Sequence, residues 1–378
     1  MNEFFKDNFS RFFDEPNEML DVSKAFKESS EWYKVSNKDT SVKMINEDTE
    51  IPESVSEDVI LDTAQNTQLL VIVRVANNAL VLPVRTCAVP SILRRAGFAC
   101  EVAGKLSKKR LAELLTEFFP INGGSSILHK SFEKLSFAGA GGTYAPMEPY
   151  DLLNILYDKI EERFKDYDFQ KGFISHYETH MCLALTSMQE EITRAYDKVI
   201  SGTDSDSREL LPKIRFSTSE LGDSAVHITA KLCDTSAKRE IGIGSIFEVV
   251  HKGTSTMKTF EDNCGKIYSH LLKSTENLNR LFDTEIVLPV DCMKNIGKSL
   301  GFRKKDLDPY FSETVNLFLH KHGNKPTSAG ELYWALSEMI SLMQINGFSD
   351  AAITVIEEKL MTTLSPRFSW SHYDYKAV

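Results

Sequence analysis

The sequence lacks the short cysteine spacings that hold metal ions or disulfide frameworks. Its six cysteines lie far apart without a CxxC pair, so in a long chain they indicate small buried hydrophobic residues. No apolar run approaches the roughly 20 residues that span a bilayer, and the first residues lack the basic start and apolar core of a signal peptide. We therefore expect a cytoplasmic protein without a membrane partner.

Positive charge is also scarce in the chain as a whole. The formal net charge is -10 over 378 residues. Residues 1–60 hold 15 acidic against 7 basic side chains and carry -8, so the remaining 318 residues carry only -2. This excludes the whole-molecule cationic field that drives nonspecific DNA binding. Local basic surfaces on a nearly neutral body remain compatible with the composition.

Catalytic signatures are missing as well. Neither GxSxG nor HExxH occurs, and the P-loop and protein-kinase patterns are absent. The glycine run Gly139–Gly142 leads into Thr143 and not into a Gly-Lys-Ser/Thr helix start, so we interpret it as a flexible or close-packed turn. His176 and His180 lack a third ligand nearby, and we predict no metal, no cofactor and no catalytic residue. An enzyme with an unfamiliar site near Tyr144 and these histidines is the least supported class.

The patterns that are present favour an α+β fold, with antiparallel sheets, flanking helices and a helical C-terminal third. We expect residues 1–60 to form an acidic, partly disordered N-terminal arm, with a polar linker over 36–57. Residues 61–255 should hold the α+β core, and residues 256–378 should form a helical region with short loops.

Individual elements follow from hydrophobic periodicity and from turn and cap signals. β-Branched or alternating runs predict strands at 69–75, 79–84, 126–130, 134–138, 173–177, 180–185, 213–218, 225–232 and 245–251. Apolar residues at helical spacing predict helices at 4–13, 17–33, 89–96, 108–119, 148–165, 188–200, 256–282, 289–300, 306–322, 328–346 and 350–364. Pro120 is expected to end the helix that begins at Lys108.

Two basic clusters are the candidate binding residues. Phe302 and Tyr310 flank the second of them. Cationic residues beside aromatic rings are the footprint of single-strand binding, because charge follows the backbone while rings stack on bases. The alternative is an ordinary solvated helix face. The clusters comprise Lys105, Lys108, Lys109 and Arg110 at one helix start, and Lys294, Lys298, Arg303, Lys304 and Lys305 on and after another helix.

One stretch carries a family resemblance. An apolar run precedes a Tyr-x-Pro step at Tyr144 and Pro146, and a helix then opens with Asp151 and two leucines. These features resemble the phage/plasmid-like proteins grouped as domain of unknown function 932. Similar segments occur at 93–98, 216–225 and 251–253, so the resemblance covers roughly residues 65–300 in order. The family often has Ser-Asp-Arg before the tyrosine, where this chain has Gly141-Gly142-Thr143, so a role carried by that Asp-Arg pair is not implied here.

The resemblance implies a mobile-element setting, such as a phage, a plasmid or an integrated element, and it transfers no catalytic residue. We predict a non-enzymatic accessory protein that handles nucleic acid, with single-stranded DNA as the expected ligand. The alternative is a protein-interaction factor that inhibits a host defence system through its acidic arm or its sheet surface, with a host protein as partner. A homo-oligomer is compatible with either function.

Overall fold

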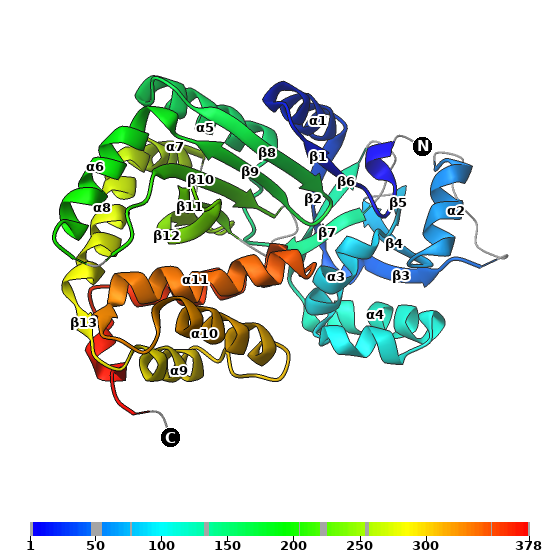
Figure 1. Cartoon of the computed structure of the whole chain (residues 1–378). Coiled ribbons are helices and arrows are strands. Elements are labelled where there is room, and N and C mark those ends of the chain that lie inside the picture. Colours follow the sequence, from blue (N-terminus) through cyan, green and yellow to red (C-terminus); the bar gives the residue numbers. More distant parts are fainter. Residues whose placement is uncertain are drawn as a thin grey trace.

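The computed structural model describes residues 3–46, 55–75, 78–131, 136–203, 205–219, 225–253, 257–348 and 350–376. The expected α+β fold is confirmed: in these segments helices pack on antiparallel sheets of six, three, three and two strands (Figure 1). None of the described helices is long and apolar enough to cross a membrane.

The six-stranded sheet is the centre of the larger core. Its strand order is β1-β8-β9-β10-β11-β12, and every neighbouring pair is antiparallel. Burial alternates strictly along β10, as expected for a sheet with one apolar and one polar face. The strands are β1 (Ser10–Phe13), β8 (Asp168–Ser175), β9 (Thr179–Ala184), β10 (Leu210–Thr218), β11 (Val226–Asp234) and β12 (Arg239–Val249).

Helices cover the apolar face of this sheet. They are α1 (Pro16–Glu28), α5 (Pro149–Arg163), α6 (Gln189–Ile200), α7 (Met257–Cys264) and α8 (Ile267–Asn279). The α5 stripe of Leu152, Leu153 and Leu156 is fully buried in one core with sheet residues such as Phe216. The single helix predicted over 256–282 is two helices, because the chain turns at Gly265 between α7 and α8.

The C-terminal third is helical, as predicted. It contains α9 (Pro289–Ser299), α10 (Asp308–His322), α11 (Ala329–Ile345) and α12 (Asp350–Met361), with the short pair β13 (Glu285–Ile286) and β14 (Thr327–Ser328). Helices α11 and α12 reach the polar side of the large sheet. There the Tyr333 hydroxyl donates to the Gly242 carbonyl, and Glu357 binds Lys231 at 2.9 Å.

A second core and a small apolar cluster at α2 are built from elements that lie beside the six-stranded sheet; these elements are shown in Figure 1. The predicted β4–β5 hairpin and α3 are confirmed, with Gly97 left-handed at the end of α3. Helix α4 continues through Pro120 to Asn122, so the predicted end of this helix is wrong. The elements are β2 (Ser30–Ser36), β3 (Thr40–Met44), α2 (Glu57–Gln65), β4 (Leu69–Val75), β5 (Asn78–Pro83), α3 (Val89–Ala96), α4 (Lys108–Asn122), β6 (Ser125–Ser131) and β7 (Ser136–Gly141).

The N-terminal segment over residues 3–46 differs from the expected arm. The helix predicted at 4–13 is instead a short 3-10 helix at Glu3–Phe5 followed by strand β1, which pairs with β8, and the helix predicted at 17–33 ends at Glu28. Strand β2 then pairs with β6, and β3, inside the expected linker, pairs with β4. The sequence of this acidic segment did not predict these strands, because the strands are stabilised by pairing with distant segments. Residues 47–54 of the expected linker lie outside the described residues.

The glycine run is mainly a strand and not a turn. Gly139, Ala140 and Gly141 belong to β7, where the Gly139 N–H donates to Ser91 Oγ at 2.9 Å. A Cβ on Gly139 would lie 3.2 Å from Ile92 Cγ1. The close-packed part of the prediction is thus correct, since Gly139 lets α3 approach the strand.

Candidate functional site

The basic residues singled out from the sequence lie on the surfaces of two different parts of the protein. Arg110 and Arg303 are already paired, with Glu113 at 3.1 Å and Asp308 at 2.7 Å. The first cluster lies on the outside of the elements around the smaller core, where Lys105 ends a short 3-10 helix and Lys108, Lys109 and Arg110 form the first turn of α4. The second lies on the surface of the C-terminal helices, with Lys294 and Lys298 on α9 and Arg303, Lys304 and Lys305 in the turn before α10.

The rings expected to stack on bases at the second cluster are engaged in packing. Phe302 is 1% exposed and packs against Phe311. Tyr310 makes an edge contact with Phe348 at 5.1 Å between ring centroids. The interpretation of Phe302 as a stacking ring is therefore wrong, and what remains there is an exposed cationic turn.

The family-motif residues form a joint between the N-terminal segment and the larger core. The Tyr144 ring stacks on His251 at 5.2 Å and lies 5.5 Å from Trp32. Pro146 lies in the connection between β7 and α5. In the first turn of α5, Asp151 binds Lys27 of α1 at 2.6 Å. Tyr144 before α5 and Asp151 in its first turn therefore both contact the N-terminal segment, through Trp32 and Lys27.

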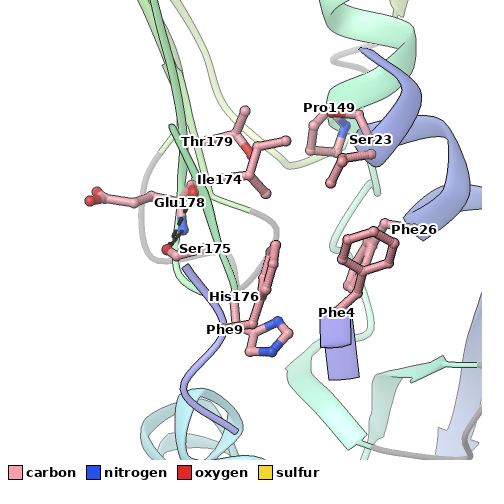
Figure 2. A pocket seen from close by; sticks show the side chains of 11 residues that line it. Phe4, Phe9, Ser23, Phe26, Pro149, Ile174, Ser175, His176, Glu178 and Thr179 are labelled. Carbon is pink, nitrogen blue, oxygen red and sulfur yellow. Dashed lines mark hydrogen bonds between the residues drawn. The ribbon is translucent and has the colours of Figure 1, made fainter. Parts of the chain in front are cut away.

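His176 lies in an aromatic pocket of its own. Figure 2 shows His176 and Phe9 facing Phe4 and Phe26 across this pocket. The imidazole Nε2 lies 2.7 Å from the Lys6 carbonyl oxygen. Burial lowers the pKa of His176 to about 4, so the ring is neutral at pH 7. This arrangement suits a core histidine that fixes the N-terminal segment.

A groove runs along the polar face of the six-stranded sheet. It consists of two hollows that share His180 and Arg215, a small one towards β1 and a larger one beneath α12. Gly242 faces Glu357 of α12 on this side, whereas Gly244 faces Ser274 of α8 on the other. Helix α12 therefore roofs one half of the polar face.

One row of side chains crosses the groove from edge to edge. Directly paired positions on all six strands carry Phe12, Phe173, His180, Ser217, His227 and Glu248. We call this set the central row. A second row beside it carries Lys171, Cys182, Arg215, Thr229 and Ser245. Because side chains at paired positions stand on the same face, both rows are on the groove side of the sheet.

The β1 half of the central row is aromatic. Phe12 is 72% exposed, and its ring centroid lies 4.8 Å from that of Phe173. Phe173 stacks on His180 at 6.0 Å with an interplanar angle of 24°. Arg215 Nη2 lies 3.4 Å from His180 Nδ1. Single exposed apolar side chains are common, but here an exposed ring, tilted by 46° against Phe173, begins a row of contacting rings that ends at a guanidinium group.

Part of the charge at the bottom of the groove is neutralised internally. Glu240 lies 3.1 Å from Lys231 and 3.0 Å from Lys213, and Glu357 also binds Lys231. Burial would raise the pKa of Glu240, but the two ammonium groups lower it to about 2. These ions hold the sheet and α12 together.

The remaining charges divide the groove into two halves. Lys171 adds positive charge at the aromatic half, and Arg215 adds positive charge where the two halves meet. Glu178, Glu248 and Glu358 add negative charge at the half beneath α12. The site therefore offers rings and cations at one end and carboxylates at the other, with His180 between them.

Sequence reasoning missed the groove. Its central row comes from six strands that span residues 12 to 248, and only the register brings them together. A usable signal was the alternation along 213–218, which places Lys213, Arg215 and Ser217 on one face. Among the described residues no group of three or more His, Cys, Asp or Glu side chains could hold a metal ion. The six cysteines are free thiols, four of them buried.

No protein-family model, no curated protein and no solved structure matches this chain. The resemblance to the phage/plasmid-like family therefore stays a prediction, and the function has to be argued from the groove.

Proposed function

We propose that this chain is a cytoplasmic accessory protein of a mobile genetic element, and that it binds single-stranded nucleic acid across the polar face of its large sheet. The observation that supports this most directly is the row of contacting rings Phe12, Phe173 and His180 on three adjacent strands, with Lys171 and Arg215 alongside. Sheets that present rings from neighbouring strands stack unpaired bases, and nearby cations hold the phosphates.

The charge distribution supports a defined position of the strand. Lys171 and Arg215 attract phosphates to the aromatic half, while Glu178, Glu248 and Glu358 repel them from the half beneath α12. The net charge of -10 opposes general adhesion to duplex DNA. We therefore expect a preference for single strands and a short binding site.

The test is fluorescence anisotropy of labelled single strands of DNA and RNA, and of a duplex, across a salt series. Phe12→Ala should weaken single-strand binding by about 1–3 kcal/mol, which is the usual contribution of one stacked base. Ile121→Ala is the matched control, because Ile121 is 68% exposed on α4 and does not line the groove. The Ile121→Ala variant should bind single strands with the same affinity as the unmodified protein.

A third variant separates the groove from the basic turn before α10. If replacing Lys304 and Lys305 by alanine abolishes binding while Phe12→Ala changes nothing, the ligand binds at that turn and the groove proposal is wrong. Unchanged anisotropy with micromolar protein at low salt would remove nucleic-acid binding altogether.

A further inference from the structure

The half of the groove beneath α12 contains carboxylates that are available to a ligand. Glu248 of β12 and Glu358 of α12 both line this hollow, and both are exposed. Within the described part of the chain, neither side chain has a hydrogen bond or an ion pair. Glu240 and Glu357 differ from them, because both are held by Lys231. The hollow therefore offers one unpaired carboxylate from the sheet below it and one from the helix above it.

A buried hydroxyl without a partner lies in the same hollow. Ser219 is 3% exposed and lines the hollow, and its Oγ meets no hydrogen-bond partner among the described residues. Burying a hydroxyl without a hydrogen bond is unfavourable. A polar ligand in the hollow therefore gains a hydrogen bond that the protein alone does not make. Ser217 and Thr229 line the hollow too, so hydroxyl groups lie beside the carboxylates.

Arg215 lies at the boundary between the aromatic half and this hollow. It lines both, with Lys171 on the aromatic side. One guanidinium nitrogen faces His180, but a guanidinium group has several N–H donors and can hold a phosphate as well. The carboxylates repel a phosphate from the hollow, whereas the base attached to that phosphate is uncharged and can enter it.

The spacing of the strands fits this placement of a nucleotide. Arg215 is on β10 and Glu248 is on β12, with β11 between them. Two strand spacings are roughly 10 Å, a distance that a single nucleotide spans. A base whose phosphate contacts Arg215 can therefore bring its edge to Glu248.

A carboxylate selects among bases by the donors on their edges. Guanine presents two adjacent donors on its Watson–Crick edge, N1–H and the 2-amino group, and the two oxygens of a carboxylate accept both. Thymine and uracil present one N3–H between two carbonyl oxygens, which a carboxylate repels. Adenine and cytosine present one amino group beside an acceptor nitrogen. In a duplex this edge is covered by the paired base, so a carboxylate can recognise guanine in this way only when it is unpaired.

We propose that the hollow beneath α12 is a base-recognition subsite in which Glu248 binds an unpaired guanine; this rests on the proposed single-strand binding. Glu248 is assigned before Glu358 because it is in the central row with the rings of Phe12 and Phe173. Stacking on rings tolerates every base, so the carboxylate supplies the selection. A basic peptide would also be attracted to the carboxylates, but the cations of the aromatic half would repel it.

The experiment measures the fluorescence anisotropy of labelled oligothymidylates that differ in one central base. That base is thymine, guanine or hypoxanthine, and hypoxanthine equals guanine without its 2-amino group. We expect the guanine strand to bind about 5- to 150-fold more tightly than the all-thymine strand, which is the usual discrimination of a bidentate contact. The hypoxanthine strand should bind with an affinity between these two.

Glu248→Gln tests the assigned residue. An amide replaces one acceptor oxygen by a donor, so this variant should lose the preference for guanine. It should bind the all-thymine strand at least as tightly as the unmodified protein does, and that binding would show that it folds. Glu276→Gln is the matched control, because Glu276 is exposed on α8, which covers the opposite face of the sheet. The control should keep the full preference for guanine.

Each contrary result has a definite meaning. Equal affinities for the guanine and thymine strands would overturn the subsite and leave single-strand binding standing. A guanine preference that persists in Glu248→Gln would overturn the assignment of this residue. Absence of binding to every strand would overturn both proposals, and saturable binding of labelled oligolysine in that case would indicate a basic protein segment as the occupant of the hollow.

Discussion

Arg208 illustrates how a buried charge is held in this molecule. Its guanidinium makes two contacts with the Glu331 carboxylate, at 3.0 and 2.6 Å, and its Cζ lies 4.7 Å from the Trp334 ring. Arg208 and Glu331 are 7% and 5% exposed. The pair joins the chain just before β10 to α11. Neither charge is well hydrated, and Glu331 is the nearest carboxylate to Arg208, while Asp206 and Asp234 lie farther away at 3.8 and 4.0 Å.

Glu331→Gln should therefore lower the free energy of unfolding by about 3–5 kcal/mol, because it leaves the Arg208 charge buried and without its main partner. Lys321→Gln is the matched control. Lys321 binds Asp206 at 2.7 Å, but each of these side chains is about half exposed, so its loss should cost less than about 1 kcal/mol. Urea unfolding followed by circular dichroism measures both values. Equal losses would contradict the argument.

His176 connects stability to pH. Burial lowers the pKa of the folded group to about 4, whereas an unfolded histidine titrates at about 6.5. Between these values the unfolded chain binds the extra proton, so stability falls as pH decreases from about 6.5 to about 4, by roughly 3 kcal/mol in all. Above that window the contribution is constant.

His176→Gln removes the titrating group. The free energy of unfolding of this variant, measured by urea titration, should vary less between pH 7 and pH 5 than that of the unmodified protein. Parallel curves for the two proteins would show that other groups cause the pH dependence.

At the scale of elements, two helical glycines mark where neighbouring elements touch. A Cβ on Gly297 of α9 would clash with the Phe311 ring of α10, and a Cβ on Gly330 of α11 would clash with the Phe282 ring. In an exposed helix, alanine is about 1 kcal/mol more favourable than glycine. Contact with a buried ring reverses that preference.

Gly297→Ala should destabilise the protein by about 1–3 kcal/mol, as overpacking of a tight core does. Gly104→Ala provides the comparison, because a Cβ there meets no atom within 4 Å. We expect its effect to stay within about 0.5 kcal/mol. Thermal unfolding reports both, and a stabilised Gly297→Ala protein would refute the tight contact between α9 and α10.

Elements with local signals were predictable from the sequence. The β4–β5 hairpin has two apolar runs of its own, and α4 begins after Ser107, whose Oγ accepts the Arg110 N–H. Strand β1 has only four residues, and it becomes a strand because β8 pairs with it. A single short segment contains no pattern that could reveal such a partner.

At the scale of the whole molecule, the N-terminal segment is part of both cores. Phe13 and Met19 are 1% and 0% exposed in the larger core, and Val35 and Val42 are buried in the smaller one. Truncating a single large core side chain costs about 2–5 kcal/mol, while a whole protein of this kind has only about 5–15 kcal/mol of stability.

Deleting residues 1–57 should therefore abolish cooperative unfolding, as seen by calorimetry, and not merely remove an acidic extension. Phe13→Ala is the graded control, with a lowered but still cooperative transition. A truncated chain that unfolds cooperatively at the temperature of the full protein would contradict the role of the N-terminal strands.

The groove is assembled by the whole six-stranded sheet. Phe12 and Glu248 are at opposite edges of one sheet, and Ser217 is paired with both histidines only because three strands keep register. Sequence reasoning selected residues that cluster along the chain, such as Lys304 and Lys305. It could not select residues that come together through strand pairing, because one sequence does not reveal which strands are neighbours.

The pairing of β1 with β8 also constrains the order of events on the ribosome. Ser10 pairs with Ser175, so the partner of the first strand is made about 165 residues later. At roughly 5–20 residues per second, that interval lasts on the order of ten to thirty seconds. Throughout it, Phe12 and Phe13 have no sheet to join. The nascent chain therefore begins with an aromatic segment that stays unpaired until β8 has been synthesised. We expect chaperones to bind this segment during that interval.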